Sequence, residues 1–332
     1  MALPRLDGSE RGKCQLDFGK LAQVDDVTFR LGVTPHDACK FLSTSPPIAY
    51  RGPIAAQSPQ IWIGCPAWSQ KEWVGRVYPE GTSSRDFFRH YAKQFTAIEL
   101  NATHYGLPEA ATLQGWKEMA PPDFRFCPKL QQDLSHRALL ATDPRAARSL
   151  LKDFVTALSP LGPQLGVSFL QLPPVFGPEH RRLLGQFLDE VPSDFPLAVE
   201  FRHPGWFENQ NLHPYVRQSL AARGVATVIT DVAGRRDVSH ASLTAQRALV
   251  RFVGNSLHAS DYARLEQWVS QLEHWFQIGL NEVYFFMHQP DDVLAPDLVR
   301  FFVERLNERL GKRFGLSLPV WREWESQASL FG

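Results

Sequence analysis

Charged and amide side chains alternate with apolar ones in two short segments of the chain. Glu99 and Asn101 do so in TAIELN (96–101), and Glu200 and Arg202 do so where LAVEF (197–201) ends. Side chains two residues apart share one face of a β-strand, so each polar pair points the same way. Charges within strands are costly unless they are paired, hydrogen-bonded or hydrated. The pattern therefore predicts a polar cavity that these side chains face.

Two carboxylates across such a cavity, Glu99 and Glu200, could serve as a general acid and a general base. Asp231 ends a third apolar segment and is a further candidate for this role. The alternative is structural, with each carboxylate neutralised by a neighbouring cation such as Arg202 or Arg251. We take Glu99, Glu200 and Asp231 as the candidate catalytic residues.

Cations and hydrogen-bonding side chains also follow the apolar segments. The guanidinium fork of arginine suits phosphate or carboxylate, which favours a site for an anionic ligand. The other interpretation is a charge network in which three cations balance the three carboxylates. The candidate ligand-binding residues are Asn101, Tyr105, Lys129, His136, Gln171, Arg202, His203, Trp206, Arg251 and Asn255.

Aromatic and imidazole side chains leave two further alternatives open. Tyr105 and Trp206 could stack on a sugar or a base, or they could form the apolar core of their loops. Four histidines, together with the carboxylates, could supply ligands for a divalent metal, namely His104, His136, His203 and His288. However, no HxH or HExxH spacing is present. We predict no cofactor and assign no metal ligand, while a divalent metal stays an alternative.

The elements that would position these residues form a regular series. Eight apolar segments, each rich in β-branched or aromatic residues, have the character of buried parallel strands. They lie at 61–65, 96–101, 124–129, 166–172, 197–201, 226–231, 248–253 and 282–287. Amphipathic helical patterns separate them; the last, PDLVRFFVERLNERL, is followed by Gly311 as its expected C-terminal cap.

Strands that alternate with helices imply βαβ units and a parallel sheet. Eight such units in about 270 residues match the closed (β/α)8 or TIM barrel, whose active sites lie at the carboxyl ends of the strands. An open doubly wound sheet is the alternative. The first segment, IWIGCPAW, lacks the GxGxxG turn that many such folds use to bind dinucleotides. The sequence therefore predicts an α/β chain with a TIM-barrel-like fold.

The first 59 residues differ from the rest. They include LSTSPPIAYRGPIAAQSP, which is typical of a linker or an extended segment. We predict an N-terminal extension over 1–59 that contributes no barrel strand, and a barrel domain over 60–332.

Composition limits the class of partner. The chain has 35 Lys and Arg against 35 Asp and Glu, so its formal charge is zero and nucleic-acid binding is not indicated. Its four cysteines form no CxxC pair, which favours a reduced, cytoplasmic setting. No apolar run reaches the ~20 residues of a membrane helix. We expect a small polar or anionic molecule as the partner, with no membrane.

Seven segments in order, IWIGCPAWSQKEWVGRVYP, TAIELNATHYGLP, FRFCPKLQQDLSH, FLQLPPVF, LAVEFRHPGWF, VITDVAG and VRFVGN, resemble the YecE-like family, domain of unknown function 72. The resemblance covers about residues 60–310 and implies a TIM-barrel-like fold. All the candidate residues named above match the family pattern. Cys65-Pro66-Ala67, His104 and Val253 depart from it.

The family's name states no biochemical function, so three hypotheses follow from the residues themselves. The first is an enzyme that uses acid-base chemistry on a small anionic or sugar-like substrate, as a hydrolase, lyase or isomerase. The second is a non-catalytic protein that binds a metabolite or a nucleic-acid end. The third is a divalent-metal-dependent hydrolase or isomerase.

Overall fold

The computed structural model describes residues 58–141, 144–234 and 237–319. Almost all of the predicted N-terminal extension lies outside these ranges. The expectation that it contributes no strand therefore stays a prediction.

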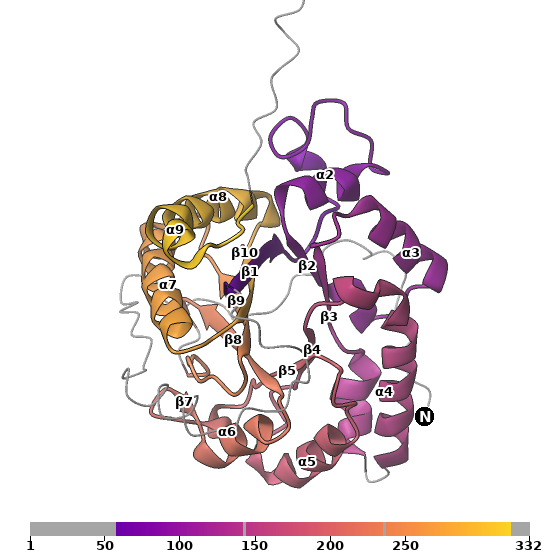
Figure 1. Ribbon diagram of the computed structural model, residues 1–332. Coiled ribbons are helices and arrows are strands. Elements are labelled where there is room, and N and C mark those ends of the chain that lie inside the picture. Colours follow the sequence, from indigo (N-terminus) through magenta and orange to yellow (C-terminus); the bar gives the residue numbers. More distant parts are fainter. Residues whose placement is uncertain (1–57, 142–143, 235–236, 320–332) are drawn as a thin grey trace, which may run out of the picture.

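Eight parallel strands form one sheet that curls into a nearly closed barrel (Figure 1). In spatial order the strands are β3, β2, β1, β10, β9, β8, β5 and β4. Isolated parallel bridges, Phe126 to Leu165 and Lys129 to Phe169, connect β3 with β4. The TIM-barrel-like fold is confirmed, and each predicted strand is present. The strands are β1 (Gln60–Cys65), β2 (Ala97–Leu100), β3 (Arg125–Pro128), β4 (Ser168–Gln171), β5 (Leu197–Glu200), β8 (Ala226–Val232), β9 (Arg247–Val253) and β10 (Glu282–His288).

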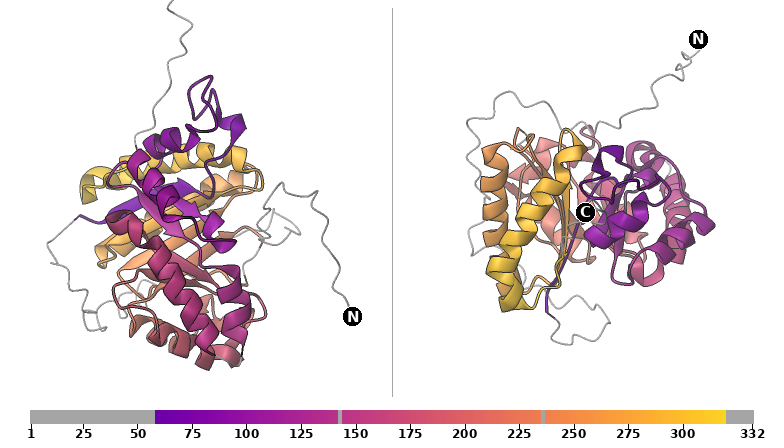
Figure 2. Two further views of the ribbon diagram at one scale, coloured as in Figure 1. Left: turned by 90° about the vertical axis from the view of Figure 1, so that its right-hand side faces the viewer. Right: turned by 90° about the horizontal axis from the view of Figure 1, so that it is seen from above.

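Helices surround the strands, as the alternating sequence pattern predicts. Seen from above, α7 and α8 lie on one side of the strands and α3 and α4 on the other (Figure 2). A two-stranded hairpin, β6 (Phe207–Glu208) and β7 (Asn211–Leu212), follows β5. The helices are α2 (Phe87–Gln94), α3 (Ala110–Met119), α4 (Pro144–Leu158), α5 (Arg181–Asp189), α6 (Pro214–Ala221), α7 (Ala259–Gln277), α8 (Ala295–Leu306) and α9 (Lys312–Phe314).

The expected cap at Gly311 is wrong. Its φ is −51°, and the helical path of α8 continues through Asn307–Gly311 into α9. Gly315 ends it instead, with φ of 63° in the left-handed region that a glycine adopts without steric cost.

The lower part of the barrel interior is apolar. Trp62 stacks on Tyr284 with ring centroids 4.8 Å apart, and small or apolar side chains such as Ala97 and Leu249 fill the space around them. Two residues further along, the same face of each strand becomes polar. The pairs are Ala97 and Glu99, Cys127 and Lys129, Phe169 and Gln171, Ala198 and Glu200, Leu249 and Arg251, and Phe286 and His288. The period of two thus carries polar side chains into the barrel at its carboxyl end.

Gly64 allows β1 to approach β2. A Cβ at this position would lie 1.9 Å from the carbonyl oxygen of Ala97, which is part of the backbone and cannot rotate away. The hydroxyl of Tyr91 lies at the same place and donates to that oxygen at 2.8 Å. Only glycine fits there, so this residue fixes the spacing of the two strands.

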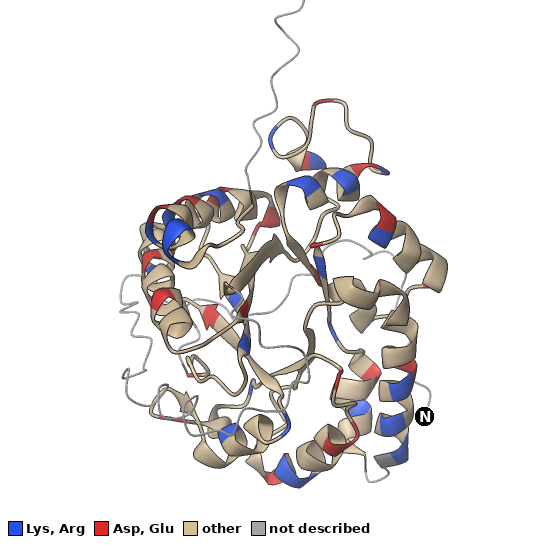
Figure 3. Ribbon diagram, viewed as in Figure 1, with Lys and Arg blue, Asp and Glu red and all other residues tan. Residues whose placement is uncertain are grey.

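Most charged residues lie on the helices and loops rather than on the strands (Figure 3). Many of them form exposed ion pairs, such as Arg76 with Asp297 at 2.9 Å. Within the part of the chain that the structure describes, no helix combines the length and apolar character needed to cross a membrane. The few charges inside the barrel are therefore the exception that needs an explanation.

Candidate functional site

Arg251 of β9 lies at the centre of the polar cluster. Its Nε and Nη2 donate to the two oxygens of Glu99, at 3.0 and 2.9 Å, and its Nη1 donates to Glu200 Oε2 at 2.8 Å. All three side chains are at most 1% exposed. Below the guanidinium lies the ring of Phe169, whose centroid is 5.4 Å from Arg251 Cζ. One arginine thus bridges two buried carboxylates from distant strands.

Glu99 has two further partners. His288 Nε2 lies 2.9 Å from Glu99 Oε2, and Asn101 Nδ2 donates to Oε1 at 2.9 Å. Because a carboxylate only accepts, this bond fixes the Asn101 amide, and its Oδ1 points away from Glu99. That oxygen is buried and has no hydrogen-bond partner among the described residues. An acceptor is therefore left open at the end of β2.

Glu200 begins a chain of contacts that runs to Lys129. Arg202 Nη1 donates to Glu200 Oε1 at 3.0 Å, and Gln171 Nε2 donates to Oε2 at 2.9 Å. The other end of the same amide, Gln171 Oε1, accepts from Lys129 Nζ at 2.9 Å. The side chain of Arg202 is 12% exposed, which makes it the more accessible guanidinium of the cluster.

The arginines hold both carboxylates in the ionised form. Burial is the largest single influence and would raise the pKa of each, but the charge of Arg251, added to that of His288 at Glu99 and of Arg202 at Glu200 and to the hydrogen bonds of their partners, outweighs it. The pKa of Glu99 therefore lies far below its usual range, and that of Glu200 is lowered to about 2. A group with so low a pKa takes up a proton poorly near pH 7. This finding favours the structural interpretation of Glu99 and Glu200 over acid-base roles.

Lys129 differs from the two arginines of the cluster in its contacts with carboxylates. It is 4% exposed, and among the described residues no carboxylate lies within ion-pair distance of its Nζ. Burial, and then the charge of Arg251, lower its pKa to about 8. The charge of Lys129 acts in turn on His104 and His136. Burial and this charge lower the pKa of His104 to about 4 and also lower that of His136, so both imidazoles are neutral at pH 7.

Among the described residues, the hydrogen-bonded cluster has a surplus of positive charge. Its three cations, Lys129, Arg202 and Arg251, share it with two carboxylates, and both of these already accept from an arginine. Asp292 interacts with Glu99 and His288 through its charge but forms no ion pair with the described cations. The expected balance of three cations with three anions fails because Asp231 is absent from the cluster.

Asp231 is the clearest correction to the sequence prediction. Its Oδ1 accepts from Arg264 Nη1 at 3.1 Å and its Oδ2 from Trp268 Nε1 at 2.8 Å, both on α7. It therefore faces outward, beneath the helix. Its neighbour Thr230, which pairs in register with Arg251, has the inward position instead. An acid-base role at the barrel mouth does not fit Asp231.

Trp206 is the next candidate from the sequence. Its indole is fully buried, and its N–H donates to the carbonyl oxygen of Phe176 at 2.6 Å. The ring packs against Phe201, with centroids 5.1 Å apart. These contacts fit the interpretation as loop core and place Trp206 outside the polar cluster, while a ligand contact by this side chain stays a prediction.

The remaining candidates lie around the cluster or outside its network. Tyr105 is 67% exposed and packs edge-on against His104, whose ring centroid is 5.7 Å from that of His136. His203 accepts from the backbone N–H of Gly205 at 2.9 Å and so caps a short helical turn. Asn255 donates its backbone N–H to Asp261 at 2.7 Å.

His288 and His104 are the residues that sequence reasoning underrated. His288 ends β10 and His104 ends the short helical turn Asn101–His104 after β2, but neither is among the candidate ligand-binding residues. The signal for His288 was its place two residues after Phe286, on the inward face of β10. His104 Nδ1 lies 2.7 Å from the carbonyl oxygen of Leu130. No sequence pattern indicates that contact.

The described ranges of the chain contain no group of three or more His, Cys, Asp or Glu side chains arranged to hold a metal ion. The oxygens of Glu99 and Glu200 are instead directed at arginine, histidine and amide donors. The donor set of the cluster does not fit a metal site.

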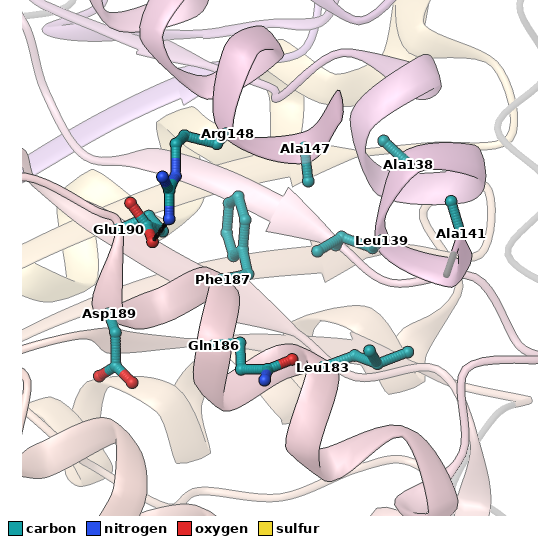
Figure 4. A pocket seen from close by; sticks show the side chains of 10 residues that line it. All are labelled: Ala138, Leu139, Ala141, Ala147, Arg148, Leu183, Gln186, Phe187, Asp189 and Glu190. Carbon is teal, nitrogen blue, oxygen red and sulfur yellow. Dashed lines mark hydrogen bonds and ion pairs between the residues drawn. The ribbon is translucent and has the colours of Figure 1, made fainter. Parts of the chain in front are cut away.

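A cavity of about 230 Å³ lies outside the barrel, between α5, the beginning of α4 and the segment that precedes α4 (Figure 4). Its lining is largely apolar, with Leu139 and Phe187 among its members and the ion pair of Arg148 and Glu190 beside them. None of the predicted site residues lines it, so the chemistry of the barrel end does not extend there.

Comparison with known proteins gives the same family as the sequence segments. Residues 62–320 match the model of a protein family described as "Protein of unknown function DUF72". The chain belongs to the DUF72 family. Two curated relatives are UPF0759 proteins. YecE of Escherichia coli K12 is 36% identical over 268 residues, covering 75% of this chain and 94% of YecE. YunF of Bacillus subtilis is 26% identical over 208 residues, covering 59% and 71%.

Two solved DUF72 structures share the fold. The protein from Enterococcus faecalis gives a TM-score of 0.63 at 17% identity, covering 80% of this chain and 99% of that one. The protein from Thermotoga maritima gives 0.61 at 23% identity, covering 75% and 99%. The DUF72 barrel is thus common to all three chains, while the function must be argued from the site.

Proposed function

We propose that this DUF72 protein is an enzyme that binds a small anionic, hydroxylated molecule at the carboxyl end of its barrel and acts on it by acid-base chemistry. One observation carries the proposal. Lys129 is buried at the end of β3 in a cluster that, within the described ranges, holds three cations and two carboxylates, and neither carboxylate forms an ion pair with it.

A buried ammonium group that forms no ion pair lowers the stability of the fold. An apolar side chain of similar length would be less costly at this position. A residue that reduces stability in this way is typical of a functional site. The missing negative charge would come from the ligand.

Asn101 adds a second requirement. Its open Oδ1 needs a donor, such as a hydroxyl or amino group of the ligand or a bound water molecule. A ligand with an anionic end and a hydroxyl group satisfies both Lys129 and Asn101. Hydroxy acids and small sugar phosphates have this combination.

The proposed roles differ from those predicted from sequence. Lys129 is the proton-transfer group, because a pKa of about 8 lets it gain and lose a proton near neutral pH. Arg202 and the neutral imidazoles of His104 and His136 bind and orient the substrate. Glu99 and Glu200 are positioning residues, since they hold Arg251 and Arg202 in place.

A non-catalytic protein that binds a metabolite or a nucleic-acid end would use the same contacts, and turnover separates the two functions. The test is a screen of small anions by thermal unfolding, followed by a turnover assay on those that bind. We expect acetate, lactate, sulfate and glycerol phosphate to raise the Tm of the full chain to different extents, with the hydroxylated anions most effective.

The variant Lys129→Met should lose this rise and all turnover, whereas Lys152→Met, an exposed lysine on α4, should keep both. A rise in Tm that is the same in wild type and Lys129→Met would refute the proposal. Anion binding without turnover of any hydroxylated anion would favour the non-catalytic alternative.

A further inference from the structure

We propose that Lys129 is a nucleophile that forms an imine with a small anionic carbonyl compound, such as a 2-oxo acid. This inference rests on the proposed function, because the same cations would bind the anionic group. It narrows the substrate to anions that also carry a carbonyl group, and it adds bond formation to the proton transfer by Lys129.

The contacts of the amine suit this reaction. Nζ donates to the neutral amide oxygen of Gln171 at 2.9 Å and lies in no ion pair with the described carboxylates. An amine held by a carboxylate would be kept protonated, whereas an amide acceptor lets the neutral form persist. Gln171 is itself half-buried, so the amine lies just below the accessible rim of the cluster.

The neighbouring cations both activate the amine and supply the binding site. Burial and the charge of Arg251 lower the pKa of Lys129 to about 8. Relative to a lysine of pKa 10.5, this makes the fraction of neutral amine at pH 7 larger by about 300-fold. Among the lysines of the described ranges, Lys129 alone is buried.

Arg202 is the expected partner of the substrate's anionic group, and its strand, β5, is separated from the strand of Lys129, β3, by β4 alone. Lys129 follows β3 and Arg202 follows β5, and Gln171 of β4 lies between them and bonds to both Lys129 and Glu200. Arg202 is fixed by Glu200 and is 12% exposed. A carboxylate directly bonded to a carbonyl carbon suits this spacing better than a long substrate, because the two binding groups belong to one compact cluster.

The step balances without an oxidant or a reductant. The neutral amine of Lys129 attacks the carbonyl carbon, a C–N bond forms, and a proton moves from nitrogen to oxygen to give a carbinolamine. Loss of the hydroxyl group together with the remaining N–H proton, as water, gives the neutral imine, which takes up a proton equivalent to the one that the ammonium form of Lys129 released. The protonated imine keeps the positive charge of the cluster, so the anionic group stays neutralised.

The test is reductive trapping. The full chain is incubated with pyruvate and cyanoborohydride, and the modified lysines are mapped by peptide mass spectrometry. We expect one reduced adduct on Lys129, formed at least about tenfold faster than on the exposed Lys152 because of its lowered pKa. Lactate, which lacks the carbonyl, and acetone, which lacks the charge, should leave Lys129 far less modified.

Two variants separate this inference from the proposed function. Lys129→Met should lose both trapping and anion binding, whereas Lys129→Arg should lose trapping but keep the rise in Tm with lactate. Adducts that are spread over the exposed lysines, or absence of an adduct on Lys129 while lactate still raises the Tm, would overturn the imine and leave the proposed function intact. If lactate and pyruvate neither raise the Tm nor react at Lys129, both proposals fail.

Discussion

Arg251 holds together two carboxylates that would otherwise repel each other inside the barrel. It gives three hydrogen bonds, two to Glu99 and one to Glu200, and all three residues are inaccessible to water. A guanidinium suits this place better than an ammonium because its fork addresses both acids at fixed angles.

Replacing Arg251 tests how much its charge stabilises the two buried carboxylates. Arg251→Met should lower the free energy of unfolding by ~3–5 kcal/mol at pH 7, because it leaves buried carboxylates without their main counter-ion. Urea unfolding measures the loss, and Arg76→Met, which removes an exposed ion pair, should cost less than about 1 kcal/mol. A loss of less than 1 kcal/mol in Arg251→Met would contradict this role.

The loss of unfolding free energy caused by Arg251→Met should be smaller at acid pH. In the wild type the pKa of Glu200 is lowered to about 2, so the stability it contributes is present above its usual value and is lost as the pH falls toward 2. In the variant, burial raises the pKa of both carboxyls, and protonation then relieves the penalty. The difference between the two proteins should therefore be smaller at pH 4 than at pH 7.

The success of the sequence prediction depended on how clear the alternation was around each residue. Glu99 and Glu200 each have apolar neighbours on both sides, so their inward orientation followed from the pattern. In VITD both Thr230 and Asp231 are polar, and the pattern alone did not decide which of them faces inward. For Trp206 the sequence did not decide, because an aromatic residue in a loop has the same signal whether it binds a ligand or fills the loop core.

The strands and helices were predictable because their patterns are local. Each predicted strand overlaps an observed one, and the interior position of its polar residue followed from the period of two. Helix ends were less predictable. Gly311 was the cap expected from sequence, whereas the backbone geometry shows that Gly315 ends the helix.

The pairing of β1 with β2 depends on a glycine. Gly64→Ala should lower the free energy of unfolding by about 2–4 kcal/mol, because the new methyl group would force β1 away from the backbone of Ala97. The same substitution at Gly115 in α3, where no atom lies within 4 Å of the new Cβ, should instead stabilise by about 0.5–1 kcal/mol. Thermal melts of both variants measure these changes in stability. Equal changes at the two positions would refute the role of Gly64.

The polar cluster connects most of the barrel. Its hydrogen bonds join side chains from or directly after six of the eight strands, namely β2, β3, β4, β5, β9 and β10. Pairwise distances between strands so far apart in sequence cannot be deduced from one chain. Sequence reasoning therefore identified most members of the cluster but not their partners, nor the surplus of one positive charge.

The affinity for sulfate tests this surplus of positive charge. Sulfate keeps its charge between pH 7 and 9, while Lys129, with a pKa of about 8, loses most of its charge over this range. Titration calorimetry on the wild type should show affinity falling by about tenfold as the pH rises from 7 to 9. Lys129→Met should bind weakly at both pH values, and Lys152→Met should follow the wild type. A wild-type affinity that does not change with pH, or sulfate binding by Lys129→Met as tight as that of the wild type, would contradict it.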